Sequence, residues 1–399
     1  MIATKADSKQ WSGRQRIQAA FNHQIPDRVP KFDQTVTIEV ASAALGREVL
    51  IGGGTLRFRE VQARFEGKNS ADEFEERMFR DVADFYVELG YDMARLPWRD
   101  TRQATKKIDQ YTYQFGDPGS DGPWETCRYD PGSCNWHVAD SWLAGGDVEK
   151  LSAWLKEQAN NWDGPDTDPG RMEDISRFKA MLPDEIALCS TVAYLGIAAW
   201  DPAWLMALVL APDLVAAELD RQMEQGLADI ELAASLGIDI ALAGGDFCTK
   251  SGPAFSPATF DTLFLPRLKK LTGQCEKHGM YYVFRTDGVT WPVAESLFER
   301  SGIHGLGEID YGAGMRLGEL RRKHPRLALF GNLDCGGALI FGTEQDVRRT
   351  VRENLDETGG VGHIAGSSNA VMPETPPANF MAMLDEIDKY TPREVGGQD

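Results

Sequence analysis

The sequence predicts an α/β fold: a single (β/α)8 TIM barrel over residues 1–399, with an inserted antiparallel β-rich segment over residues 99–165. Three observations support this fold class. Short apolar runs alternate with helical patterns along most of the chain, which indicates a parallel sheet covered by helices. We count eight such runs, and eight β/α units favour a closed barrel over an open sheet. A length of 399 residues suits one large α/β domain.

The N-terminal part supplies the first two β/α units. Residues 10–23 are typical of a short helix, and a first strand is expected near Val29–Asp33. Residues 71–89 have a helical pattern. Gly90 then separates this helix from a second strand near Asp92–Leu96.

Residues 99–165 differ from the rest of the chain. The alternating run DQYTYQF and the turn-rich GDPGSDGP predict antiparallel strands. Six of the ten tryptophans lie in or beside this segment: Trp98, Trp124, Trp136, Trp142, Trp154 and Trp162. They form either a satellite hydrophobic cluster under an inserted flap or an aromatic wall that covers the mouth of the barrel and stacks on a flat substrate.

The remaining six strands follow residue 170, each with a helical pattern after it. The strands are expected at 185–190, 238–243, 280–284, 303–308, 327–331 and 362–366. Leu219, Met223, Leu227 and Ile230 are spaced along one helix face. Helix starts are indicated by Asp201-Pro202, Ser256-Pro257 and Thr375-Pro376, and helix ends by Gly279, Gly302 and Gly359.

Composition excludes several classes of function. Lys and Arg number 42 against 61 Asp and Glu, giving a net charge of −19, which disfavours binding to nucleic acid or anionic lipid. The N-terminus lacks the apolar core of a signal peptide, and the longest apolar run, Ala203–Ala211, is far shorter than the ~20 residues of a membrane span. Six cysteines without a CxxC pair suit a reducing compartment. We therefore expect a cytoplasmic protein without a membrane or nucleic-acid partner.

The active site of a β/α barrel lies at the C-terminal ends of its strands. Those ends supply Asp33 and Gln34, then Ser190, Thr191 and Tyr194, then Asp246, Cys248 and Lys250, then Arg285 and Asp287, then Glu308 and Asp310, then Asn332 and Asp334, and finally Ser367, Ser368 and Asn369. Converging carboxylates share protons and shift one another's pKa values, which suits acid/base chemistry. Individual strand-end acids can equally cap helices or hold loops.

The same residues carry a resemblance to a known family. The stretches RIQAAFNHQIPDRVPKFD, GGDFCTKSGPAFSPATFDTLFLPRLKKL, FRTDG, GNLD and GSSNAVMPETPPANF resemble the uroporphyrinogen decarboxylase-like superfamily over most of residues 14–390. Its members are (β/α)8 barrels that include uroporphyrinogen decarboxylases and methyltransferases that exchange methyl groups with corrinoid proteins.

Departures from the family pattern narrow what the resemblance implies. Decarboxylases carry an arginine-rich stretch that grips the acidic porphyrinogen, whereas residues 33–37 contain no arginine, and their histidine before Pro-x-Thr-Pro is replaced by Asn369. The zinc-dependent methyltransferases use His-x-Cys and a second Cys, where this chain has Arg285, Asp287 and Asn369. Zinc is therefore not expected there, although Asp246, Cys248 and Glu308 leave another metal set open.

The resemblance then implies a methyltransferase that moves a methyl group from a small O-methyl donor, of which methoxyaromatics are one kind, to a corrinoid (cobalamin) on a partner corrinoid-binding protein. The candidate residues are Asp246, Asp287 and Glu308 for acid/base work, Arg285 and Lys250 for a substrate carboxylate, and Tyr194, Asn369 and Asp33 for substrate hydrogen bonds. Two alternatives stay open: a decarboxylase acting on a small carboxylic acid or a porphyrinogen-like substrate, and a non-catalytic corrinoid- or ligand-binding barrel. The sequence leaves a monomer and a homodimer both open.

Overall fold

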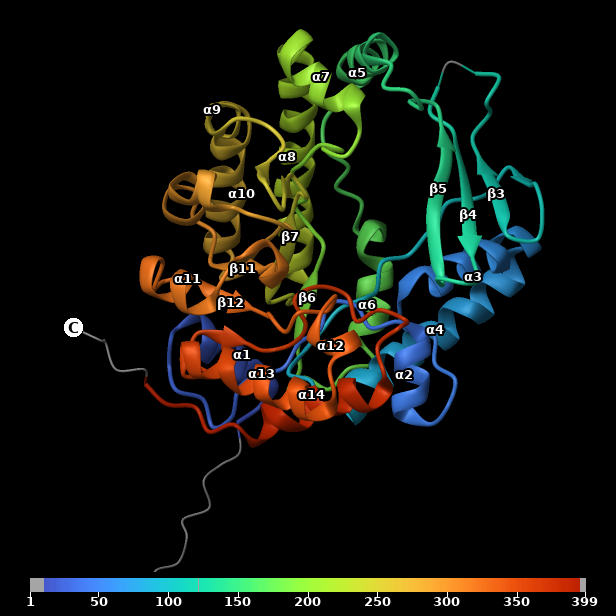
Figure 1. Ribbon diagram of the computed structural model, residues 1–399. Coiled ribbons are helices and arrows are strands. Elements are labelled where there is room, and N and C mark those ends of the chain that lie inside the picture. The colour runs from blue at the N-terminus through green and yellow to red at the C-terminus, as the bar shows by residue number, and fades with distance from the viewer. Residues whose placement is uncertain (1–10, 121, 395–399) are drawn as a thin grey trace, which may run out of the picture.

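The centre of the computed structural model, which describes residues 11–120 and 122–394, is a curled sheet of parallel strands (Figure 1). Its strand order is β1-β6-β7-β10-β11-β12-β13, and every neighbouring pair is parallel. The strands are β1 (Met93–Ala94), β6 (Ala187–Ser190), β7 (Ile240–Gly244), β10 (Tyr281–Arg285), β11 (Gly305–Gly307), β12 (Ala328–Phe330) and β13 (His363–Ile364). All seven overlap strands expected from the sequence.

The segment around Lys31 joins the two edges of this sheet. Lys31 forms a parallel bridge with Ala365, directly after β13. On its other side, the carbonyl of Lys31 accepts a hydrogen bond from the amide of Asp92, directly before β1. The first expected strand is therefore reduced to a single bridge residue, yet it occupies the eighth position and closes the ring. This confirms the barrel fold.

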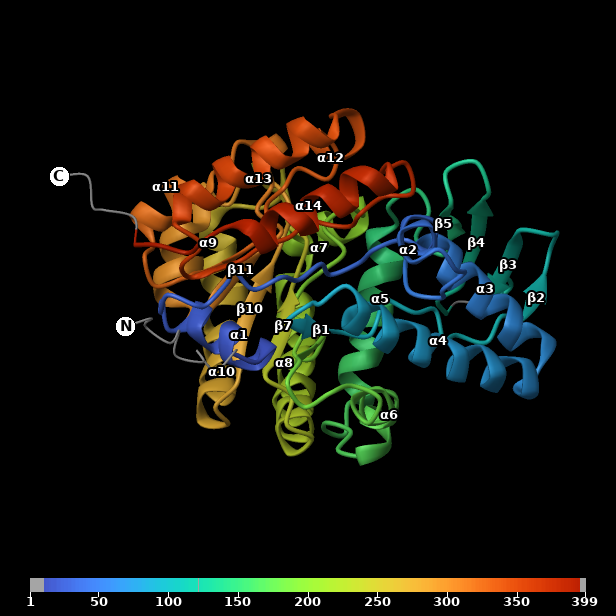
Figure 2. The same cartoon turned by 90° about the horizontal axis from the view of Figure 1, so that it is seen from below.

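Helices cover the outside of the ring. In chain order they are α1 (Gly13–Phe21), α2 (Ile38–Leu45), α3 (Gly53–Glu66), α4 (Lys68–Glu88), α5 (Val148–Asn161), α6 (Glu173–Lys179), α7 (Pro202–Leu210), α8 (Pro212–Ser235), α9 (Pro257–Thr259), α10 (Leu265–Lys277), α11 (Leu317–Lys323), α12 (Ala338–Phe341), α13 (Glu344–Thr358) and α14 (Pro377–Lys389). Figures 1 and 2 show α13 and α14 packed side by side. Between β10 and β11 the connection consists of 3-10 and π-helical turns, at Trp291–Val293 and Glu295–Arg300.

The helix boundaries follow most of the expected signals. The side chain of Asp201 caps α7 and that of Ser256 caps α9, each with proline in the first turn. Gly359 ends α13 in the left-handed conformation, with φ of 65°. The expectation for Thr375 was wrong, because Pro376 occupies the N-cap of α14 and the Thr375 hydroxyl is buried without a partner.

Alternation along the strands divides the core into two layers. In β7, Ile240 and Leu242 belong to a cluster inside the ring, whereas Ala241 and Ala243 pack against the helices. Helix α1 reaches the inner cluster through Ile17 and through Phe21, whose ring stacks on Tyr281 at 3.9 Å between centroids. The N-terminal end of the ring is thus filled, and the C-terminal end remains for the site.

The inserted sheet stands apart from the ring, beside α3 (Figures 1 and 2). It is antiparallel, in the order β2 (Lys106–Lys107), β3 (Thr112–Phe115), β4 (Glu125–Asp130) and β5 (Asn135–Ser141). The rest of the expected β-rich segment departs from the prediction, since residues 148–161 form helix α5 with Asp147 as its N-cap. Trp136 is buried with Phe58 and Tyr113 in a satellite cluster, which agrees with the first of the two interpretations of the tryptophans.

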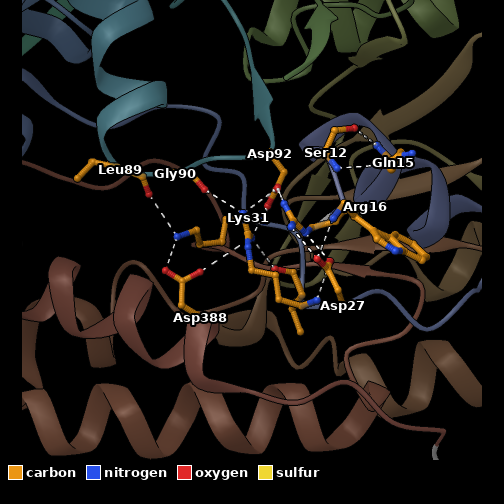
Figure 3. A network of polar contacts seen from close by, with 12 residues as sticks. Ser12, Gln15, Arg16, Asp27, Lys31, Leu89, Gly90, Asp92 and Asp388 are labelled. Atoms are coloured by element: carbon orange, nitrogen blue, oxygen red, sulfur yellow. Dashed lines mark hydrogen bonds and ion pairs between the residues drawn. The ribbon is translucent and has the colours of Figure 1, made fainter. Parts of the chain in front are cut away.

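A network of buried charges ties several elements together at the N-terminal end of the ring (Figure 3). Asp92 is 1% exposed and accepts hydrogen bonds from the guanidinium groups of Arg16 and Arg28 and from the amide of Lys31. The ammonium group of Lys31 contacts Asp388 on α14 at 2.6 Å. Arg16, Arg28 and Lys31 belong to the first stretch of the family resemblance, so that stretch has a structural role here.

Within residues 11–120 and 122–394, no single helix has the length and apolar character needed to cross a bilayer; only α7 and α8 taken together, bent by 111°, meet those two criteria.

Candidate active site

Three carboxylates meet at the C-terminal end of the ring. Asp246 follows β7 by two residues, Asp287 follows β10 by two residues, and Glu308 directly follows β11. Each offers one carboxylate oxygen, and these oxygens all lie within 4.8 Å of one another. Neighbouring strands therefore bring together the three residues that the sequence nominated for acid/base chemistry.

Glu308 is the most deeply buried carboxylate of this cluster. It is 6% exposed, and its Oε1 forms an ion pair with Arg285 at the end of β10. The same oxygen accepts a hydrogen bond from the side-chain amide of Gln34, while Oε2 is buried without a partner. Arg285 is thus already engaged by a protein carboxylate, which argues against its expected role in holding a substrate carboxylate.

Amide side chains connect Glu308 to Asp287. The Gln34 amide also donates to Oδ1 of Asn369 at 2.6 Å. The Asn369 amide in turn donates to both oxygens of Asp287, at 3.0 and 3.1 Å. Arg285, Glu308, Gln34, Asn369 and Asp287 therefore form one continuous chain of polar contacts, and Asn369 acts on the acid cluster as well as on the cavity.

Two carboxylates of this cluster, Asp287 and Asp246, have raised pKa values. Burial, followed by repulsion from Glu308 and Asp246, raises the pKa of Asp287 from 3.8 to about 7, against the opposing hydrogen bond from Asn369. Burial and Glu308 also raise the pKa of Asp246, while Arg285 acts in the opposite direction. Asp287 is therefore able to carry a proton near neutral pH, which is the property required of a general acid.

An open cavity of about 480 Å³ lies over Asp287 and Asn369. Its lining includes Lys250, which is exposed and adds a positive charge at the rim. Much of the rest is small: Gly288, Gly312 and Gly336 all contribute. The mouth is therefore wide and gives a large flat group access to Asp287.

Tyr194 and Asp33 lie in different surroundings. Tyr194 stands at the rim, 42% exposed, and burial together with Asp246 raises the pKa of its hydroxyl to about 12, so it acts as a neutral hydrogen-bonding group. Asp33 is fully buried and accepts hydrogen bonds from Ser367 and from the hydroxyl of Tyr91. Its carboxylate points into the protein and holds the loop that carries Asn369, and its contact with substrate stays a prediction.

Two residues at the end of β1, Arg95 and Trp98, belong to the same region. Arg95 was missed from the sequence, and Trp98 was noted only as one of the six tryptophans. The guanidinium groups of Arg95 and Arg285 lie 4.7 and 4.9 Å from the centroid of the Trp98 ring. Gln34, which was recognised as a strand-end residue without a role, also enters the site. The active site of a barrel lies at the C-terminal ends of all its strands, including β1. The residues that follow β1 in the stretch MARLPWRD could therefore have been selected from the sequence.

The three clustered oxygens could hold a cation. Carboxylate oxygens suit a hard ion such as Mg²⁺ or Mn²⁺, whereas zinc prefers thiolate and imidazole ligands. Cys248 is close to Asp246 in sequence but does not belong to the group of clustered oxygens. The donor set is thus a poor match for zinc.

Comparisons with known proteins agree with this geometry. The family model for uroporphyrinogen decarboxylase (URO-D) matches residues 211–390. Two curated uroporphyrinogen decarboxylases are similar to the chain: that of Alkalilimnicola ehrlichii is 29% identical over 138 residues, covering 34% of the chain and 36% of the relative, and that of Methylibium petroleiphilum is 31% identical over 189 residues, covering 46% of each. The matches thus span less than half the length of these relatives.

A solved methyltransferase from Methanosarcina mazei has a similar fold. The two chains superpose with a TM-score of 0.62 over 95% of this chain and 99% of the other, at 16% sequence identity. This likeness supports the barrel architecture over nearly the whole length of both proteins.

Proposed function

This chain belongs to the uroporphyrinogen decarboxylase-like superfamily, and on that premise we propose that it is a methyltransferase. Its donor is a small O-methyl compound, and its acceptor is a corrinoid carried by a partner protein. The observation that carries the proposal is the cluster of Asp246, Asp287 and Glu308 beside an open cavity, in which burial and the neighbouring acids raise the pKa of Asp287 to about 7. An ether oxygen leaves as a poor leaving group unless it is protonated, and Asp287 is placed to do this.

The residues of this chain supply the proton, stabilise the carboxylate that its loss leaves, and favour its replacement. As the methyl–oxygen bond breaks, the oxygen takes both bonding electrons and the proton of Asp287, and Asp287 becomes a carboxylate. Asn369 donates to both oxygens of that carboxylate and stabilises it. Glu308 and Asp246 then favour uptake of a new proton from water.

The corrinoid, when bound, supplies the nucleophile that accepts the methyl group. The cavity fits the approach of such a ring, because Gly288, Gly312 and Gly336 present no side chains at the mouth. Lys250 at the rim of the cavity and Tyr194 near Asp246 offer polar contacts to the donor or to the acceptor.

The test is an assay of methyl transfer from a panel of methoxyaromatic and aliphatic O-methyl donors to a reduced cobalamin, followed by the absorbance of the methylated product. Asp287→Asn keeps the shape of the side chain and removes the acid, and we expect it to lower kcat by about 10²–10⁴-fold. The matched control is Asp72→Asn on α4, an exposed carboxylate that pairs with Lys68 and is not part of the acid cluster.

Two other results would contradict the proposal. Release of carbon dioxide from a carboxylic acid, with no methylation of cobalamin across the panel, would support the decarboxylase alternative. Activity of Asp287→Asn equal to that of the Asp72→Asn control would show that the acid cluster is not the catalytic centre.

A further inference from the structure

Arg95 is a buried arginine without a carboxylate partner. It is 2% exposed, its Nε donates to the carbonyl of Leu96, and its Nη2 donates to the hydroxyl of Thr191 at 3.1 Å. Its Nη1 is buried without any hydrogen bond. Among the residues that the structure describes, no carboxylate forms an ion pair with it.

Three other largely buried arginines of this protein are paired with carboxylates, whereas Arg57 and Arg321, which also lack an ion pair among the described residues, donate to backbone carbonyls. Arg16 pairs with Asp27 and Asp92, and Arg285 pairs with Glu308. Arg99, four residues beyond Arg95, pairs with three acids, Glu60, Glu75 and Asp174. A buried charge without a partner is costly, so the contrast indicates that the partner of Arg95 is not part of this chain.

A cavity of about 280 Å³ lies beside Arg95, between the ends of β1 and β6 and the start of α6. Much of its wall is apolar, from Leu96, Trp98, Ile175, Phe178 and Leu188. Ser190 and Thr191 add hydroxyl groups. Its remaining charged lining residues are paired: Arg99 contacts Asp174, and Arg171 contacts Asp229. An apolar cavity with one unpaired cation fits a ligand that has an apolar body and one anionic group.

This cavity adjoins the acid cluster. Trp98 contacts Arg95 by one cation–π interaction and Arg285 by another, and Arg285 is paired with Glu308. The indole ring of Trp98 therefore lies between the unpaired guanidinium of Arg95 and the Arg285–Glu308 pair of the acid cluster.

We propose that Arg95 binds the carboxylate of the methyl donor, so that the substrate class is an O-methyl carboxylic acid with an aromatic body, held between Arg95 and Asp287. This inference rests on the proposed function for the identity of the reacting methoxy group. It transfers to Arg95 the role that the sequence had given to Arg285 and Lys250. Thr191 positions the guanidinium, and the apolar wall beside Trp98 accommodates the ring of the donor.

The experiment measures binding, without turnover, by titration calorimetry. The probes are 4-methoxybenzoate and its neutral analogue 4-methoxybenzamide. We expect the wild-type chain to bind the acid at least ten-fold more tightly than the amide. Arg95→Met keeps much of the side-chain volume and removes the charge, and it should weaken binding of the acid by roughly 10–100-fold while leaving the amide unchanged. Arg95→Lys should retain part of the preference for the acid.

Thermal unfolding of the variants without ligand distinguishes a binding role from a structural one. Because Arg95→Met removes an uncompensated buried charge, we expect its Tm to equal or exceed that of the wild type. Equal affinity of wild type for acid and amide, no binding of the acid, or unchanged acid binding by Arg95→Met would each overturn the proposal. Binding that follows Arg95 in the absence of any methyl transfer would retain this inference and refute the proposed function instead.

Discussion

Asp287 lies two residues beyond the end of β10, where Glu308 and Asp246 approach it from the neighbouring strands. Three carboxylates in so small a volume cannot all be ionised at neutral pH without large repulsion. Arg285 neutralises one of them through its pair with Glu308. A proton on Asp287 relieves part of the repulsion, so the geometry that gathers the acids also raises the pKa of Asp287.

The raised pKa of Asp287 makes stability depend on pH in a defined window. Its pKa rises from 3.8 to about 7 on folding, so the folded chain binds more protons than the unfolded chain between these values. The stabilisation is complete below pH 3.8 and is lost as the pH rises through about 7. We expect the free energy of unfolding of wild type, relative to that of Asp287→Asn, to fall between pH 4 and pH 7 and to be constant above it. Urea denaturation at several pH values measures this, and a constant difference throughout would contradict it.

Arg285 and Glu308 depend on each other. We expect Arg285→Gln to destabilise the fold by about 3 kcal/mol, because it leaves Glu308 buried without its cation. The double variant Arg285→Gln/Glu308→Gln should recover part of this loss, since neither charge of this pair is then left buried without the other. A double-mutant cycle from denaturant unfolding gives the coupling energy. Additive losses would show that the two residues are energetically independent.

At the scale of residues, position along a strand was predictable and pairing was not. Asp246, Asp287, Glu308 and Asn369 were found from the sequence because each follows a recognisable strand. The sequence could not show that Arg285 would be neutralised while Arg95 would not, since that depends on which carboxylates lie within a few ångströms after folding.

At the scale of elements, hydrophobic periodicity and the positions of glycine, proline and capping residues located the strands. Tertiary packing determined several of the helices. The helix face of Leu219, Met223 and Ile230 is buried as expected in α8. Helices α2 and α3 were not anticipated, since glycine-rich GGGT and the short apolar run IEVASAAL give weak helical signals. Helix α5 was assigned to the β-rich insertion because its neighbours are strands, although Asp147 was an available N-cap signal.

The Asp92 network joins α1, the Lys31 segment, β1 and α14 at the N-terminal end of the ring (Figure 3). We expect Asp92→Asn to destabilise the fold by about 3–5 kcal/mol, because it leaves two arginines without their shared carboxylate. Binding of 4-methoxybenzoate should be unaffected, because the network lies at the end of the ring opposite to the site, where residues contribute to stability. Asp388→Asn is the matched control: its carboxylate is 44% exposed, so a much smaller loss is expected. Equal losses from both variants would contradict a special role for Asp92.

At the scale of the whole molecule, the ring is not equally strong all the way round. β7 and β10 are paired over five residues, whereas the Lys31 segment closes the ring through one bridge and a few backbone hydrogen bonds. The same segment continues into Asp33 and Gln34, which hold the Asn369 loop and contact Glu308. The least strongly paired part of the barrel therefore adjoins the acid cluster, and the buried charges around Asp92 compensate for its few hydrogen bonds.

Native-state hydrogen exchange tests where the ring opens. The amides of Phe32 and Ala365, which bond across the seam, should open with a free energy about 1–2 kcal/mol lower than the amides of Leu242 and Val283 in the paired strands. Asp92→Asn should lower protection at the seam more than at β7 and β10, because it removes the charges that reinforce only the seam. If all four amides instead exchange together in wild type and lose protection equally in the variant, the ring opens only by global unfolding. The Asp92 network would then stabilise the whole barrel and have no particular effect on the Lys31 segment, which continues into Gln34.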